Sequence, residues 1–436
     1  MRILFVLSRT LIGANLSCRM KKEGHDVCVF IDDKFQKSCL DGMMKKTMNW
    51  EEKLDWVGKG GLIVFDDVGY GETQDQLREK GYSVVGGSAG ADFLEEKRGH
   101  GQKIFSLCGM NVAESRSFDD AYQAIRYIEK NPGKWVIKQD GHLCTLNYVG
   151  KMDDGRDVIS VLNQYAKDGV KPIELQKRVE GVEVAVGRYF NGAEWVGPVN
   201  VNFEHKPLFN GNIGPMTGEM GTLMWHEEAE QSIFFKRILS RMTDYLRQVS
   251  FRGYADINCI INKDGAWPLE ATMRFGCPIV HLQTTLQLSP WGELLKAVAD
   301  GKQYDLKYNA NYGIVVTVAV PPFPFFSYES PQREHSSEGT SIFFKENLSP
   351  DEMNRIFFQQ VRFDGKEYCI TGVTGEVLYV TGTGKTVQTA RKEAYALVDK
   401  LIIAKSFYRT DIGEKYIKND RQNLIDLGWM KEDLRQ

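Results

Sequence analysis

The first ninety residues alternate apolar runs with polar segments, and this alternation limits the possible folds more than any other feature of the chain. Residues 11–23 and 72–80 have the pattern of helices that separate buried strands. The strands are predicted at ILFVL (3–7), DVCVFI (26–31), GGLIVFDD (60–67) and YSVVGG (82–87). Strands joined through helices form a parallel sheet, so we expect an α/β protein with a Rossmann-like domain at its start. The text after the first strand, LSRTLIGANL, lacks G-x-G-x-x-G, which argues against a nicotinamide enzyme.

Composition excludes several classes of function. A chain of 436 residues is long enough for about three domains. Its formal net charge of −3 gives no reason to expect nucleic acid or an anionic membrane as a partner. The eight cysteines include no C-x-x-C, so neither a zinc site nor a disulfide framework is indicated. The start, MRILFVLSRT, has an apolar run too short for a signal peptide, and no later run approaches a membrane span. We expect a cytoplasmic protein.

Beyond residue 103 the pattern changes to shorter, mixed elements. A strand at 134–141, a helix at 157–169 and a strand at 172–179 form a segment of the size of a mobile lid. Antiparallel-looking strands, a glycine-rich stretch, a helix at 229–249 and a hairpin follow, and the proline-rich text near 320 precedes a smaller, strand-rich part. We therefore divide the chain into an N-terminal βαβ domain, a lid, a central part and a C-terminal domain. Their bounds are 1–103, 104–178, 179–320 and 321–436.

The stretch YADINCIINKDGAWPLEATMRFG, at 254–276, has the pattern of a hairpin with carboxylates on one face. Lys263-Asp264-Gly265 suits a three-residue loop with Gly265 in the left-handed conformation. That loop pairs Asn262 with Ala266, and counting outward pairs Asn258 with Glu270 and Asp256 with Thr272. These four outer residues then share one face. The other face carries the core residues Ile257, Cys259, Ile261, Trp267 and Leu269.

Oxygen ligands at this spacing suit a hard cation. Mg²⁺ takes one or two carboxylates, several waters and the phosphates of a nucleotide. Asp256, Glu270 and Thr272 are accordingly candidate metal ligands, although a solvated outer face is an equally ordinary reading of the carboxylates alone. Arg274, two residues past Thr272, could meet a phosphate or a carboxylate. The strand end therefore has the residues of a site that handles phosphoryl groups.

Three other features are weaker signals. VTGTGKT, at 380–386, resembles a phosphate-binding loop, but Tyr379 stands where that motif needs a glycine, so we expect a strand-to-helix turn capped by Thr386. His226 and His281 have no partners at metal-binding spacing, and we expect structural roles for both. Cys277 could act as a nucleophile, but no base is near it in the sequence, which favours inert packing.

The order of the motifs resembles that of ATP-grasp ligases, and specifically the phosphoribosylamine–glycine ligase (glycinamide ribonucleotide synthetase) family. The similarity covers nearly the whole chain. It rests on WVIKQDG, LQKRVEGVEV, GPMTGEMG, LEATMRFGCP and the C-terminal TARKEAYALVDKL followed by SFYRTDIGEKYI. Each motif is weak alone, but their order and spacing together indicate this fold. The resemblance implies an N-terminal pre-ATP-grasp domain, a mobile lid, a central ATP-grasp part and a small C-terminal domain that RTDIG (409–413) docks.

The resemblance also implies residues that bind the nucleotide. Lys138 matches the lid-strand lysine that holds nucleotide phosphates, and either Lys97 or Lys103 matches an earlier phosphate-contacting lysine. The stretch from Gln176 through Lys177 to Val179 corresponds to the segment that binds adenine through its backbone. Glu183 matches the acidic residue that binds the ribose hydroxyls.

Further matches concern the metal and the substrates. Glu270 matches the metal-binding glutamate, Thr272 stands where the family has asparagine, and Asp256 lies where many other ATP-grasp ligases have a carboxylate. Arg274 matches an arginine beside the acyl phosphate and is, with Lys138, a candidate catalytic residue. The candidate substrate-binding residues are Lys206, Thr217, Gly218 and Arg274. The implied cofactors are ATP with Mg²⁺ or Mn²⁺.

Several departures from the family pattern fall on its substrate-facing parts. SRTLIGAN replaces the first loop, G-G-R-E-H-A, and HLCTLNYVG replaces the glycine-rich lid loop. In RFGCPI the family's Asp and Glu have become Cys277 and Ile279. The nucleotide and metal residues are thus largely retained, whereas the parts that meet the amine are changed.

The sequence therefore predicts an ATP-dependent, ADP-forming C–N ligase of purine-biosynthetic type, which joins an amino acid such as glycine to an amine through an acyl phosphate. The amine acceptor is open: it is phosphoribosylamine, or a different nucleotide or amine. A nucleotide-binding pseudoenzyme is the alternative, and a phosphotransferase that stops at the acyl phosphate is a third. We expect small-molecule substrates, no nucleic-acid or membrane partner, and a monomer or homodimer.

Overall fold

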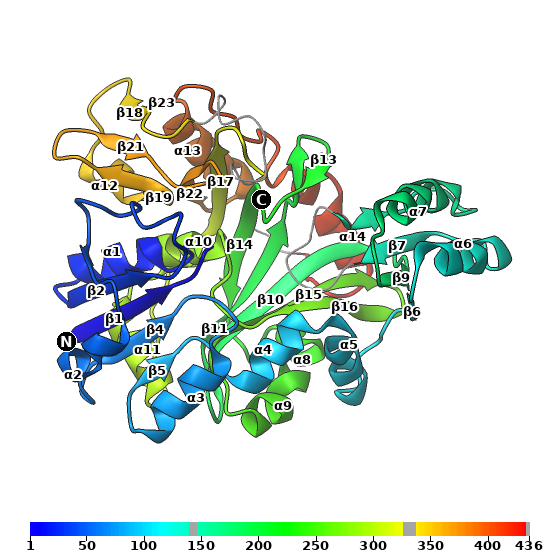
Figure 1. Ribbon diagram of the computed structural model, residues 1–436, viewed down its shortest axis with the longest axis horizontal. Coiled ribbons are helices and arrows are strands. Elements are labelled where there is room, and N and C mark those ends of the chain that lie inside the picture. Colours follow the sequence, from blue (N-terminus) through cyan, green and yellow to red (C-terminus); the bar gives the residue numbers. More distant parts are fainter. Residues whose placement is uncertain (139–145, 326–336, 433–436) are drawn as a thin grey trace.

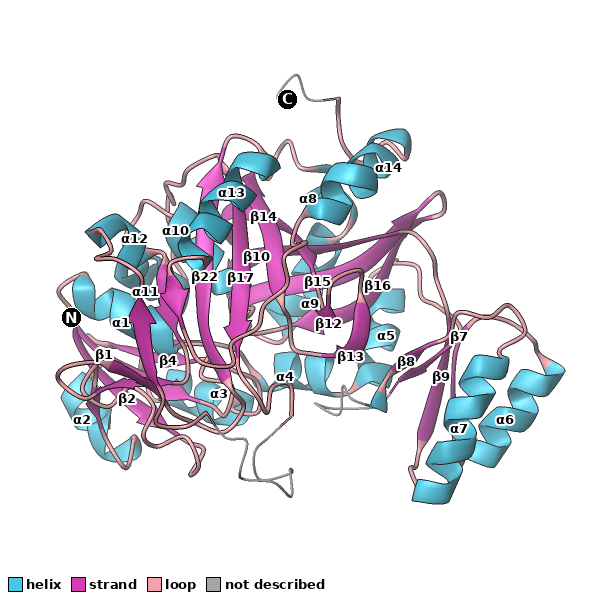
Figure 2. Ribbon diagram, turned by 90° about the horizontal axis from the view of Figure 1, so that it is seen from above, coloured by secondary structure: helices cyan, strands magenta, loops and turns pink. Residues whose placement is uncertain are grey.

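The computed structural model describes residues 1–138, 146–325 and 337–432 and contains two large sheets, one parallel and one antiparallel (Figures 1 and 2). One buried cluster joins them, because Leu7 and Val85 of the parallel sheet share it with Tyr189 and Tyr254 of the antiparallel sheet. Helix α11 (Trp291–Ala299) contributes to the same cluster. The two sheets therefore share a core and hold each other in place.

The parallel sheet is the one that the opening alternation predicted. Its order is β3-β2-β1-β4-β5, and all its neighbours run parallel. Its strands are β1 (Arg2–Leu7), β2 (Asp26–Ile31), β3 (Lys45–Lys46), β4 (Leu62–Phe65) and β5 (Val84–Val85), with helices α1 (Ala14–Lys22), α2 (Leu54–Val57) and α3 (Gly71–Glu79). Both faces of β1 and β4 are buried, which explains their unbroken apolar runs.

The strand order of this sheet reverses between β1 and β4, and the loops at the carboxyl ends of the two strands meet there. The backbone N–H groups of Ser8 and Gly13 donate to the Asp66 carboxylate at 2.7 and 3.0 Å. The Ser8 hydroxyl donates to Asp67 at 3.1 Å. Open α/β sheets bind ligands at such a reversal. The arrangement directs this end of the sheet toward the cavity described below.

The predicted lid is a separate layer with its own core. Its sheet has the order β6-β9-β7-β8, and helices α6 and α7 lie together at the end of the molecule away from the parallel sheet (Figure 2). The elements are β6 (Ser115–Phe118), α6 (Ala121–Lys130), β7 (Trp135–Lys138), β8 (Tyr148–Val149), α7 (Arg156–Asp168) and β9 (Ile173–Lys177). The first four residues of the altered lid loop HLCTLNYVG, 142–145, lie outside the described residues.

The antiparallel sheet has eight strands in the order β16-β15-β10-β11-β14-β17-β22-β19. They are β10 (Val182–Asn191), β11 (Trp195–Glu204), β14 (Gly221–Glu227), β15 (Arg252–Asn262), β16 (Gly265–Thr272), β17 (Tyr312–Ala319), β19 (Ile356–Phe358) and β22 (Glu376–Gly384). A short hairpin of β12 (Pro207–Phe209) and β13 (Ile213–Met216) stands beside it. The sheet runs across residue 320, so its C-terminal strands continue the central part without a break.

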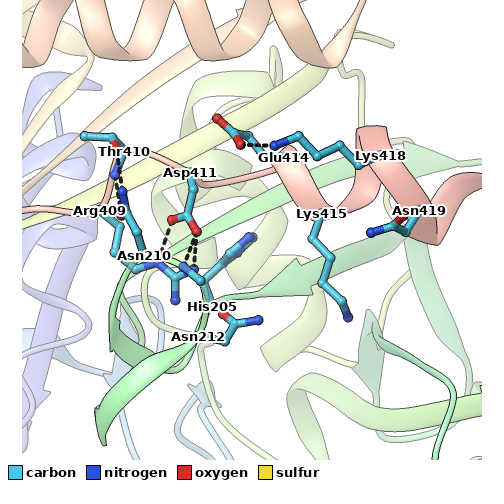
Figure 3. A pocket seen from close by; sticks show the side chains of 11 residues that line it. His205, Asn210, Asn212, Arg409, Thr410, Asp411, Glu414, Lys415, Lys418 and Asn419 are labelled. Carbon is cyan, nitrogen blue, oxygen red and sulfur yellow. Dashed lines mark hydrogen bonds and ion pairs between the residues drawn. The ribbon is translucent and has the colours of Figure 1, made fainter.

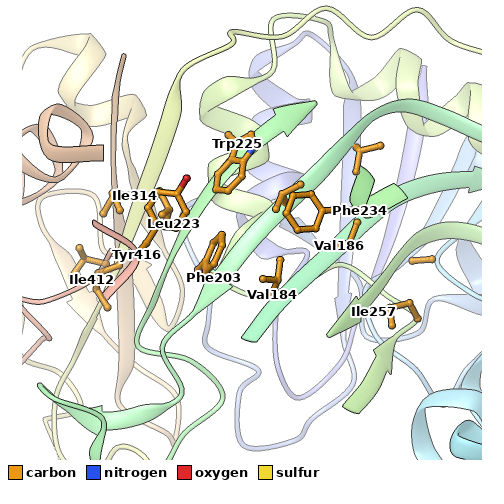
Figure 4. Packing of buried hydrophobic residues seen from close by; sticks show 14 of the residues in the cluster. Val184, Val186, Phe203, Leu223, Trp225, Phe234, Ile257, Ile314, Ile412 and Tyr416 are labelled. Atoms are coloured by element: carbon orange, nitrogen blue, oxygen red, sulfur yellow. The ribbon is translucent and has the colours of Figure 1, made fainter. Parts of the chain in front are cut away.

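Apolar side chains cover one face of this sheet (Figure 4). Phe203, Trp225 and Tyr416 pack together, with ring centroids 4.8 to 5.6 Å apart. Residues 229–249, predicted as one helix, instead form α8 (Ile233–Arg237), a 3₁₀ turn (Leu239–Met242) and α9 (Thr243–Gln248), because the backbone leaves the helix at Ile238. Helices α4 (Ala89–Glu96) and α5 (Arg98–Leu107) also lie here.

The remaining C-terminal elements form a smaller sheet of order β20-β21-β18-β23 and four helical segments. They are β18 (Ser341–Phe344), α12 (Pro350–Asn354), β20 (Val361–Phe363), β21 (Tyr368–Ile370), α13 (Val387–Val398), β23 (Leu401–Ile402), a π-helical turn (Tyr416–Asp420) and α14 (Arg421–Asp426). Helix α10 (Ile279–Leu286) packs on β17 and β22. No helix in the described part of the chain is long and apolar enough to span a membrane.

The hairpin of β15 and β16 has the predicted register at its site end and a different one at its turn. Asp256 pairs with Thr272 and Asn258 with Glu270, as predicted. At the turn Asn262 pairs with Gly265, so the loop has two residues and the predicted pairing with Ala266 is wrong. A bulge next to Asn258 restores the register, since it inserts one extra residue into β16.

That bulge changes which face two side chains occupy. Ile257, Cys259 and Ile261 lie in the core, as predicted. Trp267 does not share their face, because it pairs with Ile260, and its indole N–H donates to Asn262 at 3.1 Å. Leu269 lines the cavity rather than the core. The prediction was wrong for Trp267 and Leu269 because a bulge leaves no mark in an alternating pattern.

Candidate active site

A cavity of about 330 Å³ lies where the parallel sheet, the lid and the antiparallel sheet meet. Both acidic and basic side chains line it, and most of them belong to strand ends or short loops. The lining includes Thr10, Ile12, Val68, Glu95, Glu96, Arg98, Gln102, Lys138, Asn147, Lys206, Thr217, Gly218, Glu219, Leu269, Glu270, Thr272, Arg274, Cys277 and Glu376. Residues more than 360 positions apart in the sequence therefore line the same cavity.

A cluster of carboxylates around one ammonium group lies at the cavity, which Lys206 and Glu270 of the cluster line. Lys206 Nζ lies 2.6 Å from Glu270 Oε1 and 2.9 Å from Glu204 Oε2. Asn258 donates to Glu204 at 2.7 Å and to Glu183 at 3.1 Å. The cluster exists because β10, β11, β15 and β16 are neighbours or near neighbours in the sheet and direct polar side chains to the same face.

The cluster fixes the charges of its members. Although burial opposes it, the surrounding carboxylates, Glu204 first, raise the pKa of Lys206 well above its ordinary value. Lys206 in turn holds the pKa of Glu270 far below its usual range. Glu270 is therefore an anion at any pH at which the protein would work.

Lys138, at the end of β7, approaches this cluster from the lid. Burial, together with the nearby Arg98 guanidinium, lowers the pKa of Lys138 to about 8. Arg98 Nη2 lies 3.7 Å from Glu270 Oε2. The cavity thus brings a cation of the lid, Lys138, and a cation of α5, Arg98, together with a carboxylate that stays charged, and such a set of groups suits a nucleotide phosphate and its metal ion.

Asp256 lies behind the cavity wall rather than on it. Its Oδ2 accepts hydrogen bonds from the Tyr254 hydroxyl at 3.0 Å and from Asn202 Nδ2 at 3.1 Å. Burial, with Glu204 adding to the effect, raises the pKa of Asp256 to about 7. Of the three candidate metal ligands, Glu270 and Thr272 line the cavity and Asp256 does not.

These positions can be tested against the needs of Mg²⁺. Within the described residues, no three His, Cys, Asp or Glu side chains come together as a complete metal site. Mg²⁺ does not need such a site, because it binds through one or two carboxylates, water and substrate phosphates. Glu270, with the Thr272 hydroxyl on the same strand face, fits that requirement. Asp256 stays a prediction.

Arg274 is held at the other end of the cavity. Its Nε lies 3.2 Å from Glu95 Oε1 and 3.2 Å from Asp67 Oδ1. The backbone N–H of Met273 donates to Glu95 at 2.6 Å. Helix α4, the loop after β4 and the end of β16 therefore fix the direction of the guanidinium, which is a positioning that the sequence did not predict.

The predicted nucleotide residues are distributed unevenly around the cavity. Lys138 lines it, and Glu183 belongs to its carboxylate cluster. Lys97 and Lys103 are both exposed and outside the lining, whereas Arg98, between them, lies inside it. Sequence reasoning missed Arg98. Its position at the start of helix α5 is the feature that could have indicated it.

The predicted adenine segment lies at the junction of the lid and the antiparallel sheet. Gln176 is buried in β9 and donates to Ser115 Oγ at 3.3 Å. The backbone N–H of Lys177 donates to Glu114 O at 2.8 Å, and Val179 follows the strand. None of these three residues lines the cavity as the structure describes it. Their role stays a prediction.

The four predicted substrate residues all line the cavity, and their role stays a prediction. Thr217 fixes Lys206, because its hydroxyl donates to Lys206 O at 2.6 Å and its N–H to the same oxygen at 3.0 Å. Gly218 is exposed in the wall, and Glu219 follows it. Sequence reasoning missed Glu204, Glu219, Glu95 and Glu376. GPMTGEMG contains Glu219, but no local pattern distinguishes it from a surface residue.

The weaker motifs behave as expected. Thr386 caps α13, and its hydroxyl accepts from the Thr389 N–H at 3.1 Å. His281 is buried and stacks on Tyr379, with ring centroids 4.3 Å apart. Cys277 lines the cavity, but burial, with Glu376 adding to the effect, raises its pKa well above the usual range. A neutral thiol is a poor nucleophile.

A second cavity, of about 470 Å³, lies on the far side of the β12–β13 hairpin (Figure 3). Arg409 is 1% exposed there and binds Asp411 through two hydrogen bonds of 2.8 Å. It also donates to Pro207 O at 2.9 Å. The N–H of Gly413 donates to His205 at 3.2 Å. These contacts tie RTDIG to the hairpin, so we assign this region to docking of the C-terminal segment.

Comparison with known proteins gives one consistent result. Family models described as the ATP-grasp (A) domain and the C domain of phosphoribosylglycinamide synthetase match residues 97–279 and 331–415, together more than half of the chain. Among the curated relatives, phosphoribosylamine–glycine ligase of Corynebacterium ammoniagenes is 26% identical over 358 residues, which cover 78% of each chain. The enzyme of the same name from Clostridium acetobutylicum is 24% identical over 78% of this chain and 80% of its own.

Solved structures agree on the fold. Phosphoribosylamine–glycine ligase of Thermotoga maritima superposes with a TM-score of 0.72 at 21% identity, over 94% of this chain and 100% of that chain. The biotin carboxylase domain of 2-oxoglutarate carboxylase from Hydrogenobacter thermophilus, solved with MgADP and bicarbonate, gives 0.63 at 11% identity, over 98% and 95%. The fold is that of the ATP-grasp enzymes, as predicted.

Proposed function

Since this chain belongs to the phosphoribosylglycinamide synthetase family, we propose that it is an ATP-dependent, ADP-forming ligase that joins a carboxylate to an amine. The observation that supports this best is the cavity in which Lys138 and Arg98 approach the charged carboxylate of Glu270. Glycine is the first carboxylate to test, because the similar proteins are named phosphoribosylamine–glycine ligases. The substrates are small molecules.

The chemistry needs ATP because a carboxylate oxygen is a poor leaving group. Transfer of a phosphoryl group to the carboxylate makes an acyl phosphate, which an amine then attacks. Phosphoryl transfer is catalysed mainly by positioning and charge neutralisation. Lys138 and Arg98 would neutralise phosphate oxygens on the lid side, and Arg274, fixed by Glu95 and Asp67, would hold the carboxylate or the acyl phosphate.

Glu270 and Thr272 would hold the metal ion. A bound Mg²⁺ supplies charge stabilisation to the phosphates. Lys206 contacts the same Glu270 carboxylate, so it either shares this carboxylate with the ion or moves aside. The four-part division at 1–103, 104–178, 179–320 and 321–436 belongs to this proposal, with the lid excluding water from the acyl phosphate. The adenosine contacts of Gln176, Lys177, Val179 and Glu183 also belong to this proposal.

Hydroxylamine trapping tests the proposal without knowledge of the amine. The protein is incubated with ATP, Mg²⁺, glycine and hydroxylamine, and ADP and glycine hydroxamate are measured together. We expect both products in equal amounts, and neither without glycine. ADP release that does not depend on a carboxylate, or tight nucleotide binding without release, would contradict the ligase assignment. Phosphoribosylamine in place of hydroxylamine then tests the family's own acceptor.

The affinity for nucleotide is expected to fall as the pH rises through about 8. The pKa of Lys138 is lowered to about 8, so above that value the free protein loses a cation that binds phosphate. If bound phosphate keeps Lys138 protonated, the affinity for ADP falls about fivefold between pH 8 and pH 9. Titration calorimetry with ADP over this range measures the change. Lys138→Arg, which stays charged, should remove the dependence, and an unchanged slope in that variant would argue against Lys138.

A further inference from the structure

The end of the cavity near Cys277 carries a carboxylate that no family motif accounts for. Glu376 begins β22 and lines the cavity together with Arg274 and Cys277. It comes from the C-terminal part of the chain, whereas the lining residue before it in the sequence is Cys277. It therefore reaches the site only through the pairing of β22 with β17.

A bulge turns Glu376 toward the cavity. Thr317 of β17 pairs with Tyr379 and Val318 with Leu378, but Ala319 pairs with Glu376, so Val377 is the extra residue. Because Thr317 and Ala319 lie on one face of β17, Tyr379 and Glu376 also share that face. In a regular strand Glu376 would point with Leu378 to the opposite face, into the apolar core.

Hydrogen bonds link Glu376 and its neighbours in the cavity. The Tyr379 hydroxyl bonds to Glu376 and lies 3.0 Å from Cys277 Sγ. Thr317 Oγ1 donates at 3.0 Å to the backbone carbonyl of Glu219, a second cavity carboxylate. Cys277 senses the charges of Glu376, Arg274 and Glu219, which places these three groups around it. The Tyr379 phenol thus faces Glu376 directly, and Cys277, Arg274 and Glu219 line the same cavity.

In the described part of the chain, Glu376 lacks the cation that two other carboxylates of the cavity have. Glu270 has Lys206, and Glu95 has Arg274. Within residues 1–138, 146–325 and 337–432, no ion pair is made by Glu376. Burial raises its pKa to about 7. A buried charge without an opposite charge beside it is costly, and a cationic ligand would reduce that cost.

We propose that Glu376 binds the amine acceptor in its ammonium form and accepts the proton that the amine must lose before it attacks. This inference rests on the proposed ligase function and specifies its open substrate: an amine basic enough to arrive as a cation. Arg274, the cation at this end, is positioned by two carboxylates to meet the acyl group, so Glu376 is left to meet the amine.

The step balances without a further reactant. One proton passes from R–NH₃⁺ to the Glu376 carboxylate. The nitrogen lone pair then forms the C–N bond to the acyl carbon, while the C–O bond to phosphate breaks and its electron pair leaves on the phosphate oxygen. The second proton of the nitrogen goes to the departing phosphate. Glu219, across the cavity, would help to hold the cation before transfer.

Ammonium and hydroxylamine distinguish this role from a structural one. At about pH 7.5 ammonia is almost entirely protonated, whereas hydroxylamine is mostly neutral and needs no base. With ATP, Mg²⁺ and glycine, the wild-type protein should form glycinamide from ammonium and glycine hydroxamate from hydroxylamine. Glu376→Gln should lower kcat/KM for ammonium about 100-fold and leave kcat/KM for hydroxylamine unchanged. The difference should narrow as the pH rises and free ammonia increases.

Controls separate the possible failures. Glu393→Gln, on the half-exposed side of α13, should behave as wild type with both amines. Glu219→Gln should raise KM for ammonium more than it lowers kcat. Equal activity of the wild type and Glu376→Gln with ammonium, equal losses with both amines, or no glycinamide at any ammonium concentration would overturn the role of Glu376. If the wild type forms no hydroxamate, the ligase function itself fails, and this inference falls with it.

Discussion

Glu270→Gln is expected to reduce ATP turnover about 1,000-fold while the protein stays folded. Glu270 is the cavity carboxylate whose pKa is held lowest, by Lys206 first, so it is charged at every working pH. Its loss removes the carboxylate that would hold the metal ion, and losing one such electrostatic contact costs two to three orders of magnitude in kcat. ADP release at saturating glycine and hydroxylamine, titrated with Mg²⁺, measures the effect.

The fold should tolerate this change because Lys206 keeps a second partner. Its Nζ lies 2.9 Å from Glu204, so the ammonium group is not left unpaired. An unchanged unfolding temperature would show that the lost activity is local. Glu393→Gln serves again as the control, since Glu393 is not among the residues that line the cavity. Full activity of Glu270→Gln would refute the metal assignment.

Arg409→Met is expected to lower the free energy of unfolding of the C-terminal part by about 3–5 kcal/mol. Arg409 is 1% exposed, binds Asp411 through two 2.8 Å hydrogen bonds and donates to Pro207 O (Figure 3). Removing one partner of a buried ion pair leaves the other charge without compensation, and this loss is the source of the large effect. Urea-induced unfolding measures it.

Two further variants make this prediction specific. Lys418→Met removes an ion pair with Glu414 on the same segment, but Lys418 is 68% exposed, so the change should stay below about 1 kcal/mol. Replacing Arg409 and Asp411 together by apolar residues should cost less than Arg409→Met alone. If Arg409→Met were no worse than Lys418→Met, RTDIG would not dock the C-terminal segment.

The contacts of Arg409 also connect the stability of the C-terminal segment with the cavity. Arg409 holds Pro207, at the start of β12, and Lys206 precedes Pro207. Thr217 follows β13 and binds the Lys206 carbonyl at 2.6 Å. The hairpin therefore links the C-terminal segment to the ammonium group that neutralises Glu270. Loosening RTDIG should lower activity as well as stability.

The hairpin of β15 and β16 shows what an alternating sequence pattern predicts correctly and what it does not. Alternation correctly placed Asp256, Asn258, Glu270 and Thr272 in two pairs. The predicted register is wrong at Trp267, which lies between the turn and the bulge. The shorter turn shifts the pairing by one residue, and the bulge shifts it back before Glu270. Hydrogen bonding to the neighbouring strand decides where a bulge forms, and a single strand's sequence does not contain that information.

The choice among Lys97, Arg98 and Lys103 shows a second limit. The resemblance suggested Lys97 or Lys103 as the phosphate-contacting residue, and both are exposed. Arg98, between them, has its Nη2 atom 3.7 Å from Glu270 Oε2. Neighbouring residues of a helix start point in different directions, and only the packing of α5 against β16 selects one of them.

The amino-acid sequence by itself determined the elements whose signal is local or ordered along the chain. These are the parallel sheet, read from apolar runs between helices, the N-cap at Thr386, and the ATP-grasp fold, read from the order of its motifs. Tertiary structure alone decided which distant charges meet. Lys206 lies among Glu183, Glu204 and Glu270, and Glu376 joins Cys277. The physical reason is that charge compensation depends on distances of a few ångströms between strands, and sheet order and bulges set those distances.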